Sequence, residues 1–445
     1  MRQLKVYLRT YGCQMNERDS ENVAAQFIER GHIVVDNEFD ADVFLMNTCS
    51  VREQAELKAI GKLRYVVARK KQGLPITGVF GCMAQNRGQS LFKLLPELDI
   101  VSGTWHTPNL VDFVEKCYNE RVKICRLDSD EQSHNKIYRH LPTPTKNPTA
   151  YISIMQGCSM KCSYCIVPFT RGEERSRPIE DIVKEATLLA ERGVKEICLL
   201  GQVVNAFGRK MPIGKDGASP FVQLLRKLND IPQISRIRFT SPHPSFFRDD
   251  LIKSYGSLEK LCEYVHLPIQ SGSDEILKRM KRPYRIDMFK RICDSLRAQV
   301  PVMSISTDVI VGYPQESRRD FEMTKEAFEY CNFDMAYIFK YSPRKGTPSA
   351  LENDDIPEDE KENRNQELLK VLEKQSIAFN EKLVGTTQEV LFEAAARRGE
   401  GVCMGRTRTH RKVFAKISEQ KIGEFANVRI QSASVSALTG EVAQP

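Results

Sequence analysis

The chain has 445 residues, of which 41% are hydrophobic and 28% charged, a composition typical of a globular protein. No run approaches the roughly 20 continuous apolar residues of a membrane helix, and the first residues lack a signal-peptide core, so we expect a cytoplasmic protein without a membrane partner. The net charge of +8 permits an anionic partner but does not require one.

Short apolar runs alternate with helical patterns through residues 1–125, the first expected domain. The strand candidates read VYL, IVV, DVFLMN, TGVFG and DIVSG. This alternation is typical of a parallel sheet with flanking helices. Residues 126–149 are polar and contain prolines, so we interpret them as a linker.

Residues 150–376 form the second expected domain, with six strand candidates: YISIMQ, EICLL, IRFT, YVHLPI, SISTDVIV and MAYIFKY. Helical patterns separate most of them, which predicts a partial (β/α) barrel, because a full barrel would need eight strands. Residues 377–445 contain the short alternating runs QEVLFEA, KVFAKI and NVRIQSASV, which predict a small antiparallel β-barrel. The expected fold class is therefore α/β with a terminal β-barrel.

Three of the thirteen cysteines each follow a strand candidate of the first domain: Cys13 in TYGCQMN, Cys49 in NTCSVRE and Cys82 in GVFGCMAQ. The carboxyl ends of neighbouring parallel strands lie at one edge of a sheet, where ligands bind. We therefore expect the three thiols to converge. The alternative is three independent buried thiols, since a free cysteine is most often a core residue.

The strongest motif is C-x3-C-x2-C, formed by Cys158, Cys162 and Cys165 directly after the first strand candidate of the second domain. Three thiolates on one loop can bind three irons of a cubane cluster. Structural zinc usually takes four ligands, and the sequence offers no fourth cysteine or histidine nearby. One iron would then lack a protein ligand and could bind a small chelating molecule.

This motif, with Tyr164 at its aromatic position, resembles that of the radical S-adenosylmethionine enzymes. The resemblance implies a 4Fe-4S cluster whose open iron chelates S-adenosylmethionine and whose electron cleaves it to a 5′-deoxyadenosyl radical. TYGCQMN, NTCSVRE, VPFTRGEERSRP and TDVIVGYP are similar to segments of the methylthiotransferases, in the same order along almost the whole chain.

Membership in that family implies that Cys13, Cys49 and Cys82 hold a second 4Fe-4S cluster, which carries the sulfur to be transferred. It also implies that the last domain is a TRAM domain, a small RNA-binding barrel. The expected reaction is methylthiolation, at ring carbon 2, of an N6-isopentenyladenosine beside the tRNA anticodon. S-adenosylmethionine supplies both methyl group and radical. The expected partners are the tRNA anticodon stem-loop, a reducing electron donor and an unknown sulfur donor, and we expect a monomer.

Several polar residues near predicted strand ends are candidates for contacts with S-adenosylmethionine, because sites in such folds lie at the carboxyl ends of strands. These candidates are Arg171, Glu174, Gln202, Gln270, Ser271 and Asp308. In the last domain, a basic run predicts an RNA-binding face. It comprises Arg406, Arg408, Arg411, Lys412, Lys416 and Lys421, and Phe414 and Phe425 are candidate stacking faces.

Two other functions stay open. One is the same chemistry on a threonylcarbamoyl-modified adenosine of tRNA or on an aspartate of a ribosomal protein. The other is a non-catalytic RNA-binding protein with structural metal, against which the missing fourth ligand argues.

Overall fold

The computed structural model describes residues 2–50, 53–129 and 147–443, with no description of the side chains of residues 53–55. The chain forms two compact units. The first comprises residues 1–144, 156–160 and 165–174, and the second comprises residues 145–155, 161–164 and 175–445. Most of the predicted linker, residues 130–146, lies outside the described residues.

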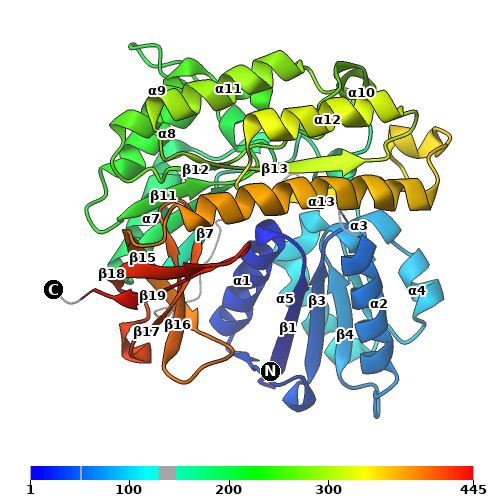
Figure 1. The fold of residues 1–445 in the computed structure, drawn as a ribbon. Helices are drawn as coiled ribbons and strands as arrows, with labels where there is room; N and C mark the ends of the chain where they lie inside the picture. The colour runs from blue at the N-terminus through cyan, green and yellow to red at the C-terminus, as the bar shows by residue number, and fades with distance from the viewer. Residues whose placement is uncertain (1, 51–52, 130–146, 444–445) are drawn as a thin grey trace. The chain divides into compact units, whose positions relative to one another are not determined.

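The first unit contains a six-stranded parallel sheet in the order β2-β1-β3-β4-β5-β6 (Figure 1). Its strands are β1 (Lys5–Tyr11), β2 (Ile33–Val34), β3 (Val43–Thr48), β4 (Ile76–Phe80), β5 (Ile100–Ser102) and β6 (Ile124–Arg126). Its helices are α1 (Gln14–Glu29), α2 (Glu53–Val67), α3 (Cys82–Arg87), α4 (Ser90–Leu94), α5 (Leu110–Glu120) and α6 (Val167–Arg171). Two 3₁₀ turns complete it, η1 (Glu38–Asp40) and η2 (Thr104–Asn109).

Helices cover both faces of this sheet, as the strand composition requires. In β3, Val43 and Leu45 pack in one apolar cluster with α1 and α5, whereas Phe44 and Met46 pack in another with α2, α3 and α4. A strand buried on both faces is apolar at every position rather than at alternate ones, which explains the run VFLM. The predicted parallel sheet is confirmed.

The second unit begins with six parallel strands in two sheets, β11-β10-β7 and β12-β13-β14, and a bridge from Ile237 to Leu261 links them. The strands are β7 (Thr149–Ser153), β10 (Glu196–Leu200), β11 (Arg236–Phe239), β12 (Tyr264–His266), β13 (Ser304–Val311) and β14 (Met335–Lys340). The helices are α7 (Ile179–Glu191), α8 (Pro220–Asn229), α9 (Asp249–Ser257), α10 (Asp274–Arg279), α11 (Ile286–Gln299) and α12 (Arg318–Cys331). All six predicted strands are present.

Alternate residues of these strands have opposite roles. Ile197, Ile237 and Ile305 pack in the large apolar core with the surrounding helices. Successive strand residues point to opposite faces, so the other set lines the concave side. Many members of that set are polar or aromatic, among them Glu196, Arg236, Arg238, Tyr264, His266, Ser306 and Asp308. The inside of this partial barrel is thus suited to polar ligands, unlike the apolar interior of a closed (β/α) barrel.

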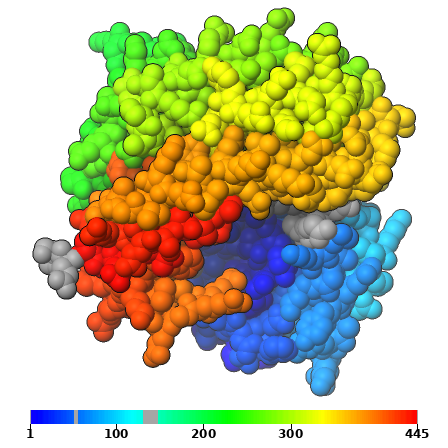
Figure 2. Space-filling model, viewed as in Figure 1, coloured from blue at the N-terminus to red at the C-terminus, as the bar shows by residue number. Residues whose placement is uncertain are grey.

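Helix α13 (Glu358–Glu381) crosses residue 376, the predicted domain boundary, and runs along the surface beside α12 (Figure 2). A closed antiparallel-rich barrel follows in the order β15-β16-β17-β19-β18, which confirms the predicted terminal barrel. Its strands are β15 (Thr387–Ala395), β16 (Val402–Thr407), β17 (Lys412–Lys416), β18 (Phe425–Ala433) and β19 (Leu438–Val442).

The remaining short elements are β8 (Met155–Gln156), β9 (Arg175–Ser176), η4 (Val204–Ala206), η5 (Pro244–Phe246), η6 (Pro348–Leu351) and η7 (Glu419–Lys421). Within the described ranges, the structure contains no helix of the length and apolarity needed to cross a bilayer.

Candidate iron–sulfur and nucleotide site

Cys13, Cys49 and Cys82 follow the carboxyl ends of β1, β3 and β4, which are adjacent strands of the first sheet. A buried amide pair fixes two of these ends, because Asn16 Nδ2 donates to Asn47 Oδ1 at 2.8 Å and Asn47 Nδ2 donates to the Asn16 carbonyl at 2.8 Å. Topology therefore brings the three thiols to one edge, as the sequence predicted.

A glycine before Cys82 is required by this packing. Gly81 has φ +91°, and a Cβ there would lie 2.3 Å from Asn47 Oδ1. Only glycine combines this backbone conformation with such close approach. The chain can therefore turn from β4 directly into α3, whose first residue is Cys82.

The thiols have unequal acidities. A hydrogen bond from Cys49 lowers the pKa of Cys13 to about 6, and the positive charge of Arg171 acts in the same direction against the effect of burial. Burial raises the pKa of Cys82, and Arg171 partly opposes this effect. Cys13 therefore lies within hydrogen-bonding reach of Cys49, and Arg171 lies close enough to interact with both Cys13 and Cys82.

Arg171 is the charged partner of this trio. Its side chain is 6% exposed, and Nη2 lies 2.7 Å from Oδ2 of the equally buried Asp19 in α1. A guanidinium has five donors, so it can serve Asp19 and a thiolate at once. The structure places Arg171 beside Cys13 and Cys82, and its expected contact with S-adenosylmethionine stays a prediction.

The trio fits a cubane cluster better than a single ion. Across residues 2–50, 53–129 and 147–443, no three Cys, His, Asp or Glu side chains lie close enough to ligate one metal ion. Three thiols on adjacent strand ends, one with a low pKa and two of them near a buried cation, form a donor set for separate irons of a cluster.

The second cysteine set lies on eight consecutive residues between β8 and α6. Cys158 and Cys162 are buried, and Cys165 is half-buried. The backbone N–H of Cys158 donates to the Gly172 carbonyl at 2.9 Å, and Arg282 Nη1 lies 3.5 Å from Cys162 Sγ.

The loop between Cys162 and Cys165 is fixed to the second unit through Ser163. Its backbone N–H donates to the Met280 carbonyl at 3.1 Å, and its Oγ lies 2.9 Å from the Tyr313 hydroxyl. Tyr164, at the aromatic position of the motif, packs against the apolar cluster that contains Met280 and Tyr313. This support holds the loop in one conformation.

The other predicted contacts lie in different parts of the chain: Asp308 is within β13, and Glu174 directly precedes the short strand β9. Gln202 follows β10, and its buried Oε1 has no hydrogen-bond partner in the described part of the chain, so it is available to a ligand. Asp308 Oδ2 lies 3.2 Å from His266 Nε2. The Glu174 backbone N–H donates to Ser159 Oγ at 3.2 Å. All these roles towards S-adenosylmethionine remain predictions.

Gln270 and Ser271 have evident structural roles. Gln270 adopts φ +65°. Its backbone N–H donates to the Asp308 carbonyl at 2.8 Å, and its carbonyl accepts from the Ile310 N–H at 3.0 Å, so it pairs with the residues that flank Val309. The fully buried Ser271 hydroxyl lies 3.3 Å from Thr324 Oγ1 and accepts from the Ser273 N–H. These bonds shape the loop after β12.

Sequence reasoning did not identify His266, whose Nδ1 lies 2.9 Å from Ser306 Oγ while the Tyr264 hydroxyl lies 2.7 Å from the same oxygen. The available signal was strand periodicity: Tyr264 and His266 alternate with the core residue Val265.

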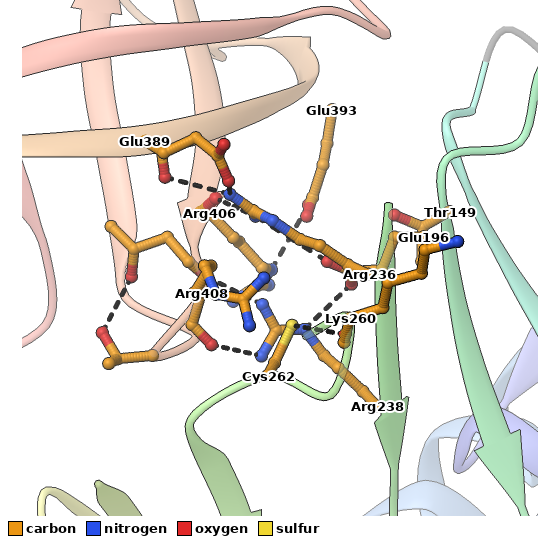
Figure 3. Close-up of polar contacts among 12 residues, drawn as sticks. Thr149, Glu196, Arg236, Arg238, Lys260, Cys262, Glu389, Glu393, Arg406 and Arg408 are labelled. Carbon is orange, nitrogen blue, oxygen red and sulfur yellow. Dashed lines mark hydrogen bonds and ion pairs between the residues drawn. The ribbon is translucent and has the colours of Figure 1, made fainter. Parts of the chain in front are cut away.

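Three arginines of the basic run in the terminal barrel make ion pairs with acidic residues of the second unit. Arg408 makes a two-pronged contact with Glu263 at 2.8 and 2.9 Å, Arg411 pairs with Asp334, and Arg406 pairs with Glu393 at 3.3 Å (Figure 3 shows Arg406 and Arg408). These three arginines are therefore ion-paired within the protein, and RNA binding by the basic run stays a prediction.

Arginines from the partial barrel also bind the terminal barrel, and we call this set of contacts the dock. Arg236 donates to the Arg406 and Glu389 carbonyls, and Arg238 donates to the Thr407 and Arg408 carbonyls at 2.8 and 2.7 Å (Figure 3). Arg236 also lies over the Phe425 ring at 4.8 Å, so this predicted stacking face is already occupied. The terminal barrel thus attaches to the amino ends of the parallel strands, away from their carboxyl ends.

These features define a radical enzyme: a partial (β/α) barrel with three closely spaced cysteines in its first loop, joined to an α/β unit with three further thiols. Three domain families match the chain: Uncharacterized protein family UPF0004 over residues 5–103, the Radical SAM superfamily over residues 152–328 and the TRAM domain over residues 381–443. The tRNA-2-methylthio-N(6)-dimethylallyladenosine synthases of Opitutus terrae and Akkermansia muciniphila are 48% and 45% identical, with 98% of this chain covered in both cases and 97% and 98% of the relatives. The chain belongs to this synthase family of radical SAM tRNA methylthiotransferases.

Solved structures support the fold. The radical S-adenosylmethionine methyltransferase TsrM from Kitasatospora setae, with cobalamin and a [4Fe-4S] cluster bound, matches with a TM-score of 0.57 at 13% identity. The match covers 79% of this chain and 74% of that chain.

The low pKa of Cys13 makes a pH-dependent prediction for the metal-free chain. We expect its alkylation by iodoacetamide to accelerate as pH rises through about 6, since the thiolate is the nucleophile. Cys49→Ala removes the main cause, so the midpoint should move up towards the ordinary value of about 8.5. Peptide mass spectrometry of quenched samples measures both midpoints, and equal midpoints would contradict the assignment.

Proposed function

We propose that Cys158, Cys162 and Cys165 hold the 4Fe-4S cluster that binds S-adenosylmethionine, and that Cys13, Cys49 and Cys82 hold the second 4Fe-4S cluster of this methylthiotransferase. The convergence of β1, β3 and β4 on one thiol-lined edge carries the second assignment. When bound, the two clusters supply the electron for cleavage of S-adenosylmethionine and the position that holds the transferable sulfur.

The residues around the cysteines balance the charge of the thiolates and offer polar groups to a ligand. Arg282 donates towards Cys162, and Arg171 neutralises the negative charge that three thiolates and Asp19 bring to the other site. Gln202 offers a carbonyl oxygen to an amino or hydroxyl group, and His266 with Asp308 offers a polar edge on the concave side of the barrel. Side-chain groups of this kind are suited to the polar ends of S-adenosylmethionine or to an adenine ring.

The reaction at ring carbon 2 of adenine explains the need for a radical source. A hydrogen on ring carbon 2 of adenine is not acidic, and positioned acids or bases typically contribute only about 10²–10⁴ in rate. A carbon radical can remove that hydrogen. The substrate of this proposal is N6-isopentenyladenosine beside the anticodon, where a single-stranded loop lets a base be splayed out and read.

The family supports the proposed partner and location. The relatives are synthases of a tRNA nucleoside, so the anticodon stem-loop is the proposed partner and the cytoplasm the proposed location. A monomer with an external electron donor and a sulfur donor completes the proposal.

Iron analysis and nucleoside analysis test this function together. We expect about eight irons and eight sulfides per chain after anaerobic reconstitution, because two cubanes hold four of each. Liquid chromatography with mass spectrometry should show that 2-methylthio-N6-isopentenyladenosine disappears from the tRNA of a deletion strain and returns on complementation. Persistence of this nucleoside, with loss of methylthiolated threonylcarbamoyladenosine or ribosomal-protein aspartate, would favour the alternative targets.

A further inference from the structure

The segment from Lys278 to Arg285 is the most basic surface stretch beside the cysteine loop of the second unit. It reads KRMKRPYR, with five cations and no acidic residue in eight positions. Lys278, Lys281 and Arg285 are exposed, and Arg279 and Arg282 are half-buried. A basic cluster of this kind on an RNA-modifying enzyme can attract RNA phosphates.

The segment is built to present these charges. Helix α10 ends at Arg279, Lys281 then adopts φ +55°, and the Arg282 N–H closes the turn on the Leu277 carbonyl at 2.8 Å. The buried side chains of Met280 and Tyr284 anchor the turn, the latter through a 2.6 Å hydrogen bond to the Ile269 carbonyl. Around these anchors, Lys278, Lys281 and Arg285 are exposed, whereas Arg282 points towards Cys162.

Three of the charges are free of carboxylate partners within the described residues. Arg279 pairs with Glu275 at 3.3 Å and Arg282 lies beside Cys162, whereas Lys278, Lys281 and Arg285 have no ion pair in the portion of the chain that the structure describes. The contrast with the terminal barrel is direct: there, among the described residues, only Lys412 and Lys416 of the six basic residues lack a carboxylate partner.

The segment also lies beside the loop that carries Cys162. The Met280 carbonyl accepts from the Ser163 N–H, and the Arg279 carbonyl accepts from Ser163 Oγ at 2.9 Å. Within the second unit, α10 lies at the opposite end of the partial barrel from the terminal barrel (Figure 1). An RNA loop that delivers a base to the carboxyl ends of the strands would bring its phosphates to this segment.

We propose that Lys278, Lys281 and Arg285 form an RNA-phosphate site that holds the backbone of the anticodon loop beside the cysteine loop. This inference rests on the proposed function, since it assumes a tRNA substrate. On this proposal, part of the electrostatic attraction for RNA comes from the radical SAM part of the chain and not from the terminal barrel alone. Contacts of this kind fix register and orientation without reading sequence.

The test is the salt dependence of tRNA binding by the reconstituted full-length enzyme. The variant combines Lys278→Gln, Lys281→Gln and Arg285→Gln, and the probe is anticodon stem-loop RNA whose only modification is isopentenyladenosine. Each lost phosphate contact should reduce the slope of log K against log salt by about 0.7 to 0.9, so the slope should fall by about 2. At 0.1 M salt, we expect at least about tenfold weaker binding.

A matched control removes the same charge elsewhere. Lys184→Gln, Lys227→Gln and Lys253→Gln neutralise three exposed lysines on α7, α8 and α9. The control should bind RNA with the slope of the parent enzyme, and thermal unfolding should verify that both triple variants are folded. An equal loss of affinity in both triple variants would show a general charge effect and overturn the site.

Other outcomes also overturn the proposal. Unchanged affinity and slope in the Lys278, Lys281 and Arg285 variant would do so. So would unchanged RNA binding with slower reduction by an acidic flavin protein, flavodoxin, but not by dithionite, since the segment would then receive an electron carrier. If the parent enzyme itself makes no methylthiolated nucleoside, the proposed function fails instead.

Discussion

Cys49→Ala is expected to abolish methylthiolated product while sparing cleavage of S-adenosylmethionine to 5′-deoxyadenosine. Cys49 hydrogen-bonds Cys13 at the thiol-lined edge of the first sheet, so its loss removes one of three ligands and the main cause of the low pKa of Cys13. Product formation should fall by at least about 10³-fold, as expected when a group that acts as a unit with others is removed. Iron content should fall from about eight to about four per chain.

Two further variants give this result its meaning. Cys162→Ala, in the other set, should abolish 5′-deoxyadenosine as well as product. Cys117→Ala should change neither, because Cys117 is a thiol of α5 that is packed in the apolar core of the same unit. Product formation by the Cys49 variant at the parent rate would show that the sulfur-carrying role lies elsewhere.

Arg238→Met should destabilise the second unit by about 3–5 kcal/mol, the usual cost of leaving a buried charge without its partner. The side chains of Arg238 and Glu196 are each only 3% exposed and lie 3.0 Å apart. The substitution also leaves the Thr407 and Arg408 carbonyls of the terminal barrel without these donors. Chemical denaturation, with limited proteolysis after α13, would measure both the loss and the release of the barrel.

A second substitution at Glu196 separates the effect of the buried charge from the effect of lost packing. Adding Glu196→Gln to Arg238→Met removes the carboxylate that has lost its nearer partner, with Arg236 3.8 Å away, and should recover part of the lost stability. Arg318→Met, which breaks an exposed pair with Glu367, should cost no more than about 1 kcal/mol. If Arg238→Met costs no more than Arg318→Met, the dock does not contribute to the stability of the unit.

This dock bears on how RNA reaches the site. The terminal barrel uses Arg408 and Arg411 to bind Glu263 and Asp334, which precede β12 and β14. Opposite charges held on both sides fix its orientation on the partial barrel. An RNA bound to it would therefore be presented in a defined direction.

The sequence by itself determined most of the elements and the grouping of the cysteines. The C-x3-C-x2-C spacing is local, so no tertiary information is needed to bring Cys158, Cys162 and Cys165 together. Strand periodicity and apolar runs identified the parallel strands of both units, and the rule that parallel strands end at one edge placed Cys13, Cys49 and Cys82 correctly.

Only the tertiary structure decided which charges meet. Arg171 is six residues from Cys165 in sequence, yet its partner Asp19 lies 152 positions away, and Arg408 meets Glu263 over 145 positions. Such pairs depend on strand order and on how one element docks on another, and they leave no periodic pattern in the chain. Isolated runs of arginine therefore resembled an RNA-binding face until packing showed which of them are already neutralised.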